Sequence, residues 1–340
     1  MFTYLETEKK LQGYTFIDLF CGIGGFHSAL SSLGGRCVFA SDIDKYAKDV
    51  YERNYGIKPT GDITKIDVKD VPQHDIICAG FPCQPFSISG DQKGFEDPRG
   101  KLFFNVVAIA KHHRPMIIFL ENVKNFEKHD GGKTLDTVKR ELGNIGYTVY
   151  AKVLCASDYG VPQARKRIYI VAFRSDLDSS RFSFPVENNN FRVVQDILIS
   201  DEENTVPGSY IIDREVTIND NLPTNPVNEL IRIGKIGKGR QGERIYSSLG
   251  VSTTLSSQGG GLGGKTGMYL INGTVRKLYP RECARLMGFP DTFVLARTQE
   301  QNYKQFGNSV VVEVIQLIAQ QFALCLPQNN IENEEGQQYD

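Results

Sequence analysis

The stretch YTFIDLFCGIGGFHSALSSLGG, residues 14–35, indicates the fold class of this 340-residue chain. Residues 14–20 are apolar and rich in β-branched and aromatic side chains, which is typical of a buried strand. The turn CGIGG follows, and FHSALSSL then has the pattern of a helix that ends at two glycines. A strand that passes through a glycine turn directly into a helix is the first unit of an α/β fold.

The same alternation continues to about residue 173. Apolar or β-rich runs occur at 36–42, 75–80, 115–121, 147–156 and 167–173, and helical patterns occur at 44–56, 102–113 and 133–146. Strands separated by helices of this length predict a doubly wound, largely parallel sheet.

The composition changes near residue 190. From there to about residue 300 the chain is rich in Gly, Asn and Ser, with short β-like runs and no long helical period. The stretch 307–326 again has apolar residues at the spacing of an amphipathic helix. We therefore predict an α/β domain at 1–193 that is completed by a C-terminal helix at 304–327. Residues 194–303 are predicted to form a smaller, mostly irregular or β domain with a hinge. Residues 328–340 are predicted to be a disordered tail.

Composition argues against several classes of protein. The chain is 40% hydrophobic with a net charge of −1, and no stretch approaches the roughly 20 apolar residues that span a bilayer. Its start, MFTYLETEKKLQG, lacks the pattern of a signal peptide, so we expect a cytoplasmic location. The seven cysteines are scattered and never spaced as C-x-x-C, so neither a disulfide framework nor a metal site is expected.

The charges are unevenly distributed. Residues 229–288 hold ten Lys or Arg against three Glu, a net charge of +7, whereas residues 328–340 hold four acids and no base. A basic segment in a neutral protein indicates either a surface that binds a polyanion or a solvated face that is balanced elsewhere. Composition alone leaves both interpretations open.

Two predicted strand ends have features of a nucleotide site, at the edge of the sheet where α/β proteins bind ligands. Gly22 and Gly24 would let a ligand approach the backbone at a helix N-terminus. His27 stands where a dinucleotide fingerprint needs its third glycine, so nicotinamide binding is not predicted. Asp42 suits two ribose hydroxyls, with helix capping as the alternative. The pattern favours a cofactor that carries a nucleoside.

Two further strand ends supply a thiol and a carboxyl group. Cys83 follows an apolar strand, and Pro82 and Pro85 restrict the backbone around it. Glu121 ends the next predicted strand, and a partly buried carboxyl group there can hold a proton near neutral pH. This pair indicates covalent addition to an electron-poor ring. A cysteine hydrolase is disfavoured because none of the five His lies in a recognisable partner motif.

The order of motifs resembles that of the C5-cytosine DNA methyltransferases. The stretches that carry the resemblance lie between residues 15 and 326 and are FIDLFCGIGGFHSAL, GDITKI, DIICAGFPCQPFS, FLENVKN, YGVPQARKRIYIVAF, RKLYPRECARLMGFP and QFGNSVVVEVI. Further stretches, including GKGRQGERIYSS, resemble the members of the family that modify GCGC. The resemblance implies a Rossmann-like domain that binds S-adenosylmethionine, a target-recognition domain, and methylation of duplex DNA at GCGC or a related site.

The resemblance also implies the catalytic roles. Cys83 would attack C6 of a cytosine that has been rotated out of the duplex, and Glu121 would meet N3 of that base. Asn122 would orient the loop, Arg165 would hold the O2 side of the ring, and Arg167 would steady the site.

The resemblance further implies two sets of contacts. The cofactor would touch Phe20, Gly22, Gly24, Asp42, Ile43, Asp62, Ile63, Pro82, Leu102 and Asn308, where Ile43 replaces a tryptophan of related enzymes. The duplex would touch Ser89, Gln241, Arg244, Thr254, Gln258, Gly259, Gly260 and Gly261, and its phosphates would meet Lys235, Lys238, Arg240 and Arg276. Ser89 and Gln241 would enter the duplex from opposite grooves, and Arg244 would read guanine.

Several alternatives remain open. One is a tRNA cytosine-5 methyltransferase of the same family, and another is a non-catalytic DNA-binding relative. We further expect that the loop 84–100 closes over DNA, that the protein acts as a monomer, and that it is a methylase of the restriction-modification type. Functional pairing with a cognate restriction endonuclease is left open by the sequence.

Overall fold

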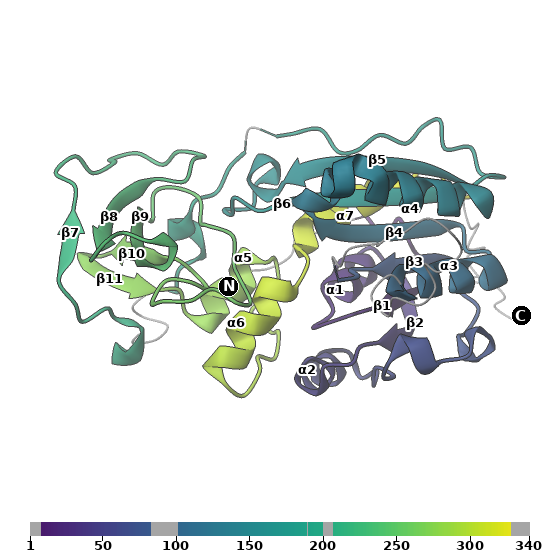
Figure 1. The fold of residues 1–340 in the computed structure, drawn as a ribbon, viewed down its shortest axis with the longest axis horizontal. Helices are drawn as coiled ribbons and strands as arrows, with labels where there is room; N and C mark the ends of the chain where they lie inside the picture. The colour runs from purple at the N-terminus through teal and green to yellow at the C-terminus, as the bar shows by residue number, and fades with distance from the viewer. Residues whose placement is uncertain (1–7, 83–100, 189, 200–206, 328–340) are drawn as a thin grey trace, which may run out of the picture.

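The structure is a computed structural model that describes residues 8–82, 101–188, 190–199 and 207–327. Within these ranges the chain forms two sheets with helices packed around and between them (Figure 1). The predicted nucleophile Cys83, Ser89, the expected closing loop 84–100 and the expected disordered tail 328–340 lie outside the described residues.

The first sheet has six strands in the order β2-β1-β3-β4-β6-β5 within the described residues. The strands are β1 (Thr15–Leu19), β2 (Arg36–Ser41), β3 (Ile76–Ala79), β4 (Ile117–Val123), β5 (Tyr147–Cys155) and β6 (Lys166–Arg174). All neighbouring pairs from β2 to β4 are parallel, and β6 runs antiparallel to both β4 and β5. The doubly wound, largely parallel sheet predicted from the sequence is confirmed.

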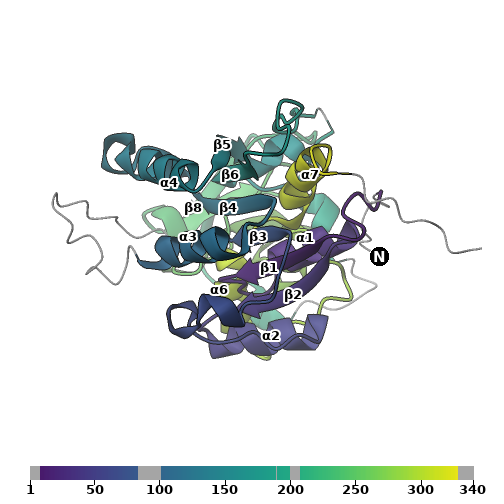
Figure 2. The same ribbon diagram turned by 90° about the vertical axis from the view of Figure 1, so that its right-hand side faces the viewer.

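Helices cover both faces of this sheet, as Figure 2 shows. The helices are α1 (Gly25–Ser32), α2 (Lys45–Tyr55), α3 (Lys101–His113), α4 (Lys133–Asn144) and α7 (Val312–Ala323). Successive side chains of a strand point to opposite faces, so Phe16 belongs to the core beneath α1 and α7, and Ile17 belongs to the core beneath α3. The strands read as continuous apolar runs because both faces are buried.

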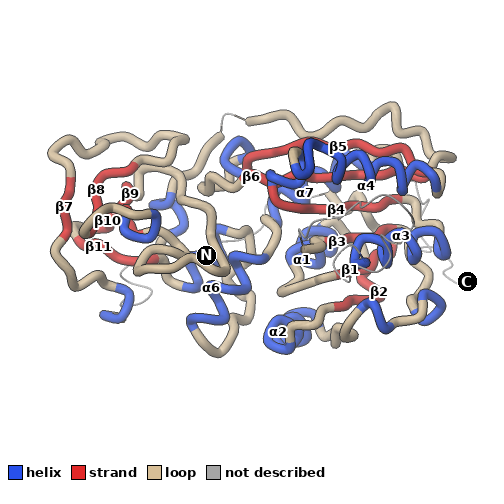
Figure 3. Tube along the Cα trace, viewed as in Figure 1, coloured by secondary structure: helices blue, strands red, loops and turns tan. Residues whose placement is uncertain are grey.

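The second sheet has five strands in the order β11-β10-β9-β8-β7 within the described residues. The strands are β7 (Val216–Ile218), β8 (Arg232–Ile236), β9 (Arg244–Ser247), β10 (Met268–Ile271) and β11 (Thr274–Lys277). Long loops lie between most of these short strands, as Figure 3 shows, whereas β10 and β11 form a hairpin with the tight turn 272–273. The sequence analysis missed α5 (Pro280–Leu286), which begins with a proline and has Glu282 in its first turn.

The single helix expected at 304–327 is wrong, because the chain forms two helices there. Helix α6 (Gln299–Asn308) ends before Ser309, and α7 starts at Val312. The carbonyl oxygens of Gly307 and Ser309 accept hydrogen bonds from Arg165 at 3.1 and 2.6 Å. These bonds satisfy backbone groups that a helix end leaves unpaired, so the break is stabilised from outside the helix. As expected, α7 packs against the first sheet.

No helix in the described part of the chain is both long enough and apolar enough to cross a membrane.

One buried imidazole makes the stability of the fold sensitive to acid. His74 is 1% exposed, and burial lowers its pKa to about 4. The unfolded chain therefore binds a proton at this residue below about pH 6.5, whereas the folded protein does so only below about 4. We expect the free energy of unfolding to fall by up to about 3 kcal/mol through this residue as the pH drops across that window.

Urea unfolding of the wild type and of His74→Phe at a series of pH values measures this effect. The difference in unfolding free energy between the two proteins should shift in favour of the variant below pH 6.5, since phenylalanine cannot bind a proton. A difference that stays constant between pH 7 and pH 4 would contradict the assignment.

Candidate active site

A pocket of about 850 Å³ opens at the carboxyl ends of β1, β2, β3 and β4. It is lined by nine of the ten residues predicted for the cofactor, namely Phe20, Gly22, Asp42, Ile43, Asp62, Ile63, Pro82, Leu102 and Asn308. The predicted catalytic residues Glu121, Asn122, Arg165 and Arg167 line the same pocket. The fold thus gathers residues that are up to 288 positions apart in the sequence, from Phe20 to Asn308.

Glu121 is a buried carboxyl group in β4. Its Oε1 atom lies 3.1 Å from Nε of Arg167, and the residue is 8% exposed. Burial raises the pKa of Glu121, although Arg167 and Arg165 act in the opposite direction. The carboxyl group therefore holds its proton to a higher pH than an ordinary glutamate does.

Arg165 lines the same pocket and is the residue immediately before β6. Its guanidinium group donates to the carbonyl oxygens of Leu255, Gly307 and Ser309 at 3.2, 3.1 and 2.6 Å. Burial lowers the pKa of Arg165 to about 9, which leaves the group charged at neutral pH. Its Nε atom is buried and has no hydrogen-bond partner among the described residues.

Asn122 connects this site to the segment that leads to the predicted nucleophile. Its Nδ2 atom donates to the carbonyl oxygen of Phe81 at 2.9 Å, and its Oδ1 atom accepts from the N–H of Val123 at 2.9 Å. These bonds hold the chain at a point two residues before Cys83.

Asp42 lies at the other end of the pocket, after β2. Its two carboxylate oxygens accept from the backbone N–H groups of Gly22 and Asp44 at 2.8 and 2.7 Å. The residue that caps α2 is Asp44, which accepts from Tyr46 and Ala47. Helix capping therefore does not explain Asp42. Burial raises the pKa of Asp42, and its hydrogen bonds to backbone N–H groups oppose this shift.

Two other cofactor candidates, Ile43 and Asp62, also line the pocket. Ile43 is 77% exposed although it lines the pocket, so an apolar side chain stands at the pocket mouth. Asp62 uses Oδ1 to accept from the N–H and the hydroxyl group of Thr64 at 3.0 and 2.7 Å, and these bonds lower its pKa.

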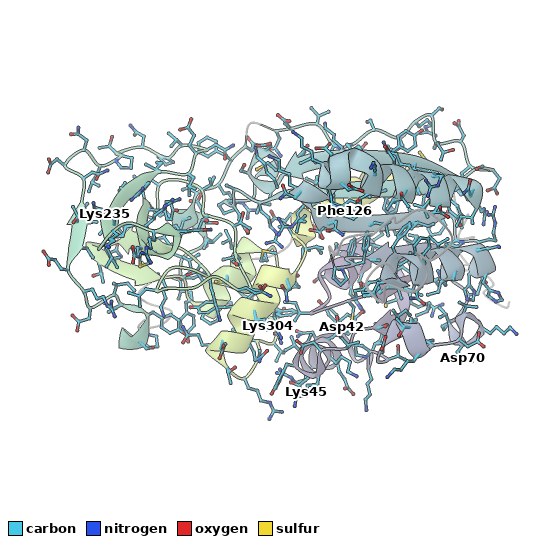
Figure 4. All side chains as sticks on the ribbon, in the orientation of Figure 1. Asp42, Lys45, Asp70, Phe126, Lys235 and Lys304 are labelled. Carbon is cyan, nitrogen blue, oxygen red and sulfur yellow. The ribbon has the colours of Figure 1, made fainter. Side chains whose placement is uncertain are left out.

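The pocket also contains residues that the sequence analysis missed. Lys304 of α6 forms an ion pair with Asp44 at 2.7 Å, and Gln305 and Ser309 follow it in the lining. Lys304 and Asp42 are labelled in Figure 4, Lys304 on α6 and Asp42 at the edge of the first sheet. Ser309 belongs to the GNSV motif, so the sequence could have predicted that it lines the site. No motif in the sequence predicts such a position for Lys304.

Gly24 is the predicted cofactor residue that the pocket lining lacks. Its backbone has φ +83°, and a Cβ atom built there would lie 2.2 Å from Cε2 of Tyr55. The glycine is needed because the ring of Tyr55 packs against the turn before α1, and its predicted contact with the cofactor stays a prediction.

Replacing Gly24 by alanine should lower the free energy of unfolding by about 2–4 kcal/mol, through left-handed strain and the collision with Tyr55. Gly56→Ala is the matched control, because Gly56 has φ +69° and open space around its Cβ position. The Gly56→Ala variant should lose only about 1 kcal/mol of unfolding free energy, because left-handed strain is its only cost. Equal losses in chemical denaturation would contradict the role of Tyr55.

The residues predicted to read DNA lie on the second sheet and its loops. Gln241 begins a short 3-10 turn and is exposed, and Arg244 starts β9 and is half-buried. The N–H of Gly263 donates to the carbonyl oxygen of Gly242 at 2.9 Å. The glycine-rich loop 259–264 therefore lies against the Gln241 turn, although the two are well separated in the sequence.

The glycines of this loop have different surroundings. A Cβ atom at Gly259 would lie 1.6 Å from the carbonyl oxygen of Gly264, whereas one at Gly260 would meet nothing within 4 Å. Gly259 is thus required for the loop to fold on itself, and Gly260 faces open space. Gln258 is exposed beside them.

Arg276 does not fit its predicted contact with phosphate. It is 6% exposed and pairs with the fully buried Glu282 through two hydrogen bonds of 2.7 Å. Lys235, Lys238 and Arg240 are exposed, as expected for contacts with a polyanion. The hydroxyl group of Thr254 donates to the carbonyl oxygen of Ala164 at 2.6 Å, so its one donor is used inside the protein.

No group of three or more His, Cys, Asp or Glu in the described ranges is arranged to hold a metal ion.

Known proteins resemble this chain over nearly its whole length. The family profile described as C-5 cytosine-specific DNA methylase matches residues 14–323. The type II methyltransferase M.HhaI of Haemophilus parahaemolyticus is 52% identical over 315 residues, which cover 92% of this chain and 95% of that protein. The type II methyltransferase M.HaeII of Haemophilus aegyptius is 42% identical over 315 residues, covering 91% and 92%.

Solved structures agree on the fold. The crystal structure of the S. pombe Dnmt2 methyltransferase superposes with a TM-score of 0.69, covering 92% of this chain and 98% of that one. At 22% identity this likeness concerns the fold alone. The profile match and the identity to M.HhaI confirm the family expected from the motif order: the chain belongs to the C5-cytosine DNA methyltransferases.

Proposed function

We propose that this protein transfers a methyl group from S-adenosylmethionine to C5 of a cytosine that has been rotated out of duplex DNA. The observation that carries the proposal is that one pocket holds both the pair of the buried Glu121 with Arg167 and the polar cofactor candidates Asp42 and Asp62. The type II methyltransferases that match the chain support the same activity and a restriction-modification role.

The pocket fits the proposed cofactor. A Cβ atom at Gly22 would meet nothing within 4 Å, so a ligand can approach the backbone after β1. Asp42 is held in place by two backbone N–H groups and retains lone pairs for ribose hydroxyls, and Asp62 supplies a carboxylate for the adenine amino group. Phe20, Ile63 and Leu102 give the apolar contacts. When bound, the cofactor supplies the electrophilic methyl group.

The chain's own residues would activate the cytosine. The thiolate of Cys83 adds to C6, and Glu121 provides a proton at N3 so that negative charge does not accumulate on the ring. Arg165 holds the O2 side of the ring, and Arg167 keeps the Glu121 carboxyl group in position. After methylation, loss of the C5 proton and elimination of Cys83 release the product. Asn122 fixes the start of the loop that carries the thiol.

We propose the second sheet and its loops, within 194–303, as the target-recognition domain, and GCGC or a related site as the target. Gln241 and Ser89 would fill the space left by the rotated base, and Arg244 would read guanine through O6 and N7. The exposed cations Lys235, Lys238 and Arg240 would meet phosphates, which makes binding dependent on salt. Gln258, Gly259 and Gly260 would complete the recognition face.

We further propose that the enzyme acts in the cytoplasm as a monomer paired with a cognate endonuclease. Bisulfite sequencing of plasmid DNA after incubation with the enzyme and S-adenosylmethionine tests the activity and the target together. We expect 5-methylcytosine at one position of GCGC. Methylation of tRNA but not plasmid would identify the tRNA-acting alternative, and methylation of neither would contradict the proposal.

A further inference from the structure

One buried amide connects the recognition loop, residues 252–258, to the wall of the active-site pocket. The side chain of Gln163 is fully buried. Its Oε1 atom accepts from the N–H of Leu255 at 3.2 Å. Its Nε2 atom lies 3.4 Å from the carbonyl oxygen of Leu286 and 3.3 Å from Sδ of Met287. A flipped amide would set its NH₂ against the N–H of Leu255, so the partners fix this orientation.

The backbones on either side of this amide run together. Gln163 and Ser252 form a parallel bridge, in which the N–H of Ser252 donates to Pro162 at 2.8 Å and the N–H of Ala164 donates to Ser252 at 2.9 Å. The hydroxyl group of Thr254 adds its bond to Ala164. The recognition loop is therefore bound to the segment that immediately precedes Arg165.

The same loop also holds Arg165 directly. Leu255, whose N–H binds Gln163, offers its carbonyl oxygen to Nη1 of Arg165 at 3.2 Å. The N–H of Arg165 donates to the carbonyl oxygen of Gln163 at 2.8 Å. Gln163 and Leu255 thus fix both the backbone and the guanidinium group of Arg165.

On its other side the loop packs closely against the end of α6. A Cβ atom at Gly307 would lie 2.3 Å from the backbone nitrogen of Ser257. Real Cβ atoms essentially never come this close to backbone, so the loop rests directly on the end of α6. Gln258, a predicted contact with DNA, is the next residue along the loop.

We propose that Gln163 is a positioning residue that couples the recognition loop to Arg165, so that correct seating of the loop on DNA sets the guanidinium group against the target base. The inference rests on the proposed function. Loss of the amide would leave the N–H of Leu255 without its partner, loosen the coupling between the loop and Arg165, and weaken discrimination between DNA sites as well as the rate of transfer.

Gln163→Met tests the proposal, because methionine keeps the length of the side chain but lacks both hydrogen-bonding groups. Single-turnover methylation is measured with saturating S-adenosylmethionine on a GCGC duplex and on duplexes with one outer base pair changed. We expect the GCGC rate to fall about tenfold or more, since small misplacement of a positioning group carries losses of this size. The ratio of GCGC to altered-site rates should fall by a similar factor, with cofactor affinity within about twofold of wild type.

Gln316→Met is the matched control. Gln316 is also buried, and its Nε2 atom donates to Oγ of Ser32 at 2.6 Å, which joins α7 to α1 away from the recognition loop. This variant loses a buried hydrogen bond but should keep both the rate and the ratio. If Gln163→Met keeps the wild-type rate and ratio, the coupling is overturned and the proposed function stands. Equal losses of rate and ratio in the two variants would have the same meaning. A wild-type enzyme that methylates no duplex would overturn the proposed function and the coupling together.

Discussion

Replacing Cys83 by serine should reduce methyl transfer by about 10³-fold or more, because removal of a catalytic nucleophile usually has an effect of at least this size. A serine hydroxyl group is a far weaker nucleophile toward C6 than a thiolate. Binding of duplex DNA should persist, since the proposed DNA contacts lie mostly on other segments. The measurement is transfer of labelled methyl groups, with DNA affinity determined on the same preparation.

Cys78→Ala is the control for the loss of a thiol as such. Cys78 is fully buried in β3, and burial raises its pKa well above the ordinary value, so it is not a reactive thiolate. This variant should transfer methyl groups as fast as the wild type per folded molecule.

A chemical trap tests the covalent step independently. A duplex with 5-fluorocytosine at the target position, supplied with the methyl donor, should leave a stable adduct on the peptide that contains residue 83, because fluorine at C5 prevents the final elimination. Full turnover by Cys83→Ser, or an adduct on another peptide, would overturn the covalent role.

Replacing Glu121 by glutamine should lower the rate of transfer by about 10²–10⁴-fold, the range for a general acid or base. Glutamine has nearly the same shape and can still donate a hydrogen bond, but it cannot release a proton to N3. It would also change the partner of the Arg167 guanidinium group, whose Nε atom lies 3.1 Å from Oε1 of Glu121. DNA affinity should change much less than the rate.

The pH profile gives this prediction a second readout. Burial raises the pKa of Glu121, so the carboxyl group keeps its proton toward neutral pH and loses it as the pH rises. The wild-type rate should fall on the alkaline side as this proton is lost, and that limb should be absent from Glu121→Gln. Glu127→Gln, a short distance beyond β4 and outside the pocket lining, is the control and should retain both the rate and the profile. The same alkaline limb in Glu121→Gln would assign it to another group.

Much of the fold follows from local pattern. Strands with alternate residues buried on two faces, such as Phe16 and Ile17 in β1, read as apolar runs, and the helices between them carry clear signals such as Asp44 before α2. The order of motifs was sufficient to predict the family. Four catalytic candidates and nine cofactor candidates that were predicted from the sequence line one pocket. Periodicity and turn residues act over a few positions, so a sequence can display them directly.

Contacts between segments that are distant in the sequence could not be predicted from local pattern. The two helices at 299–323 separate where Arg165 binds Gly307 and Ser309, about 140 residues away in the chain. Gly24 is required by the packing of the Tyr55 ring, and Arg276 is buried in an ion pair with Glu282. The sequence by itself determined the type and order of the strands and helices of the first sheet up to residue 174, and the family, because these depend on local composition and motif order. Only the tertiary structure decided which partner each polar or glycine residue has, because that partner comes from a segment brought close by folding.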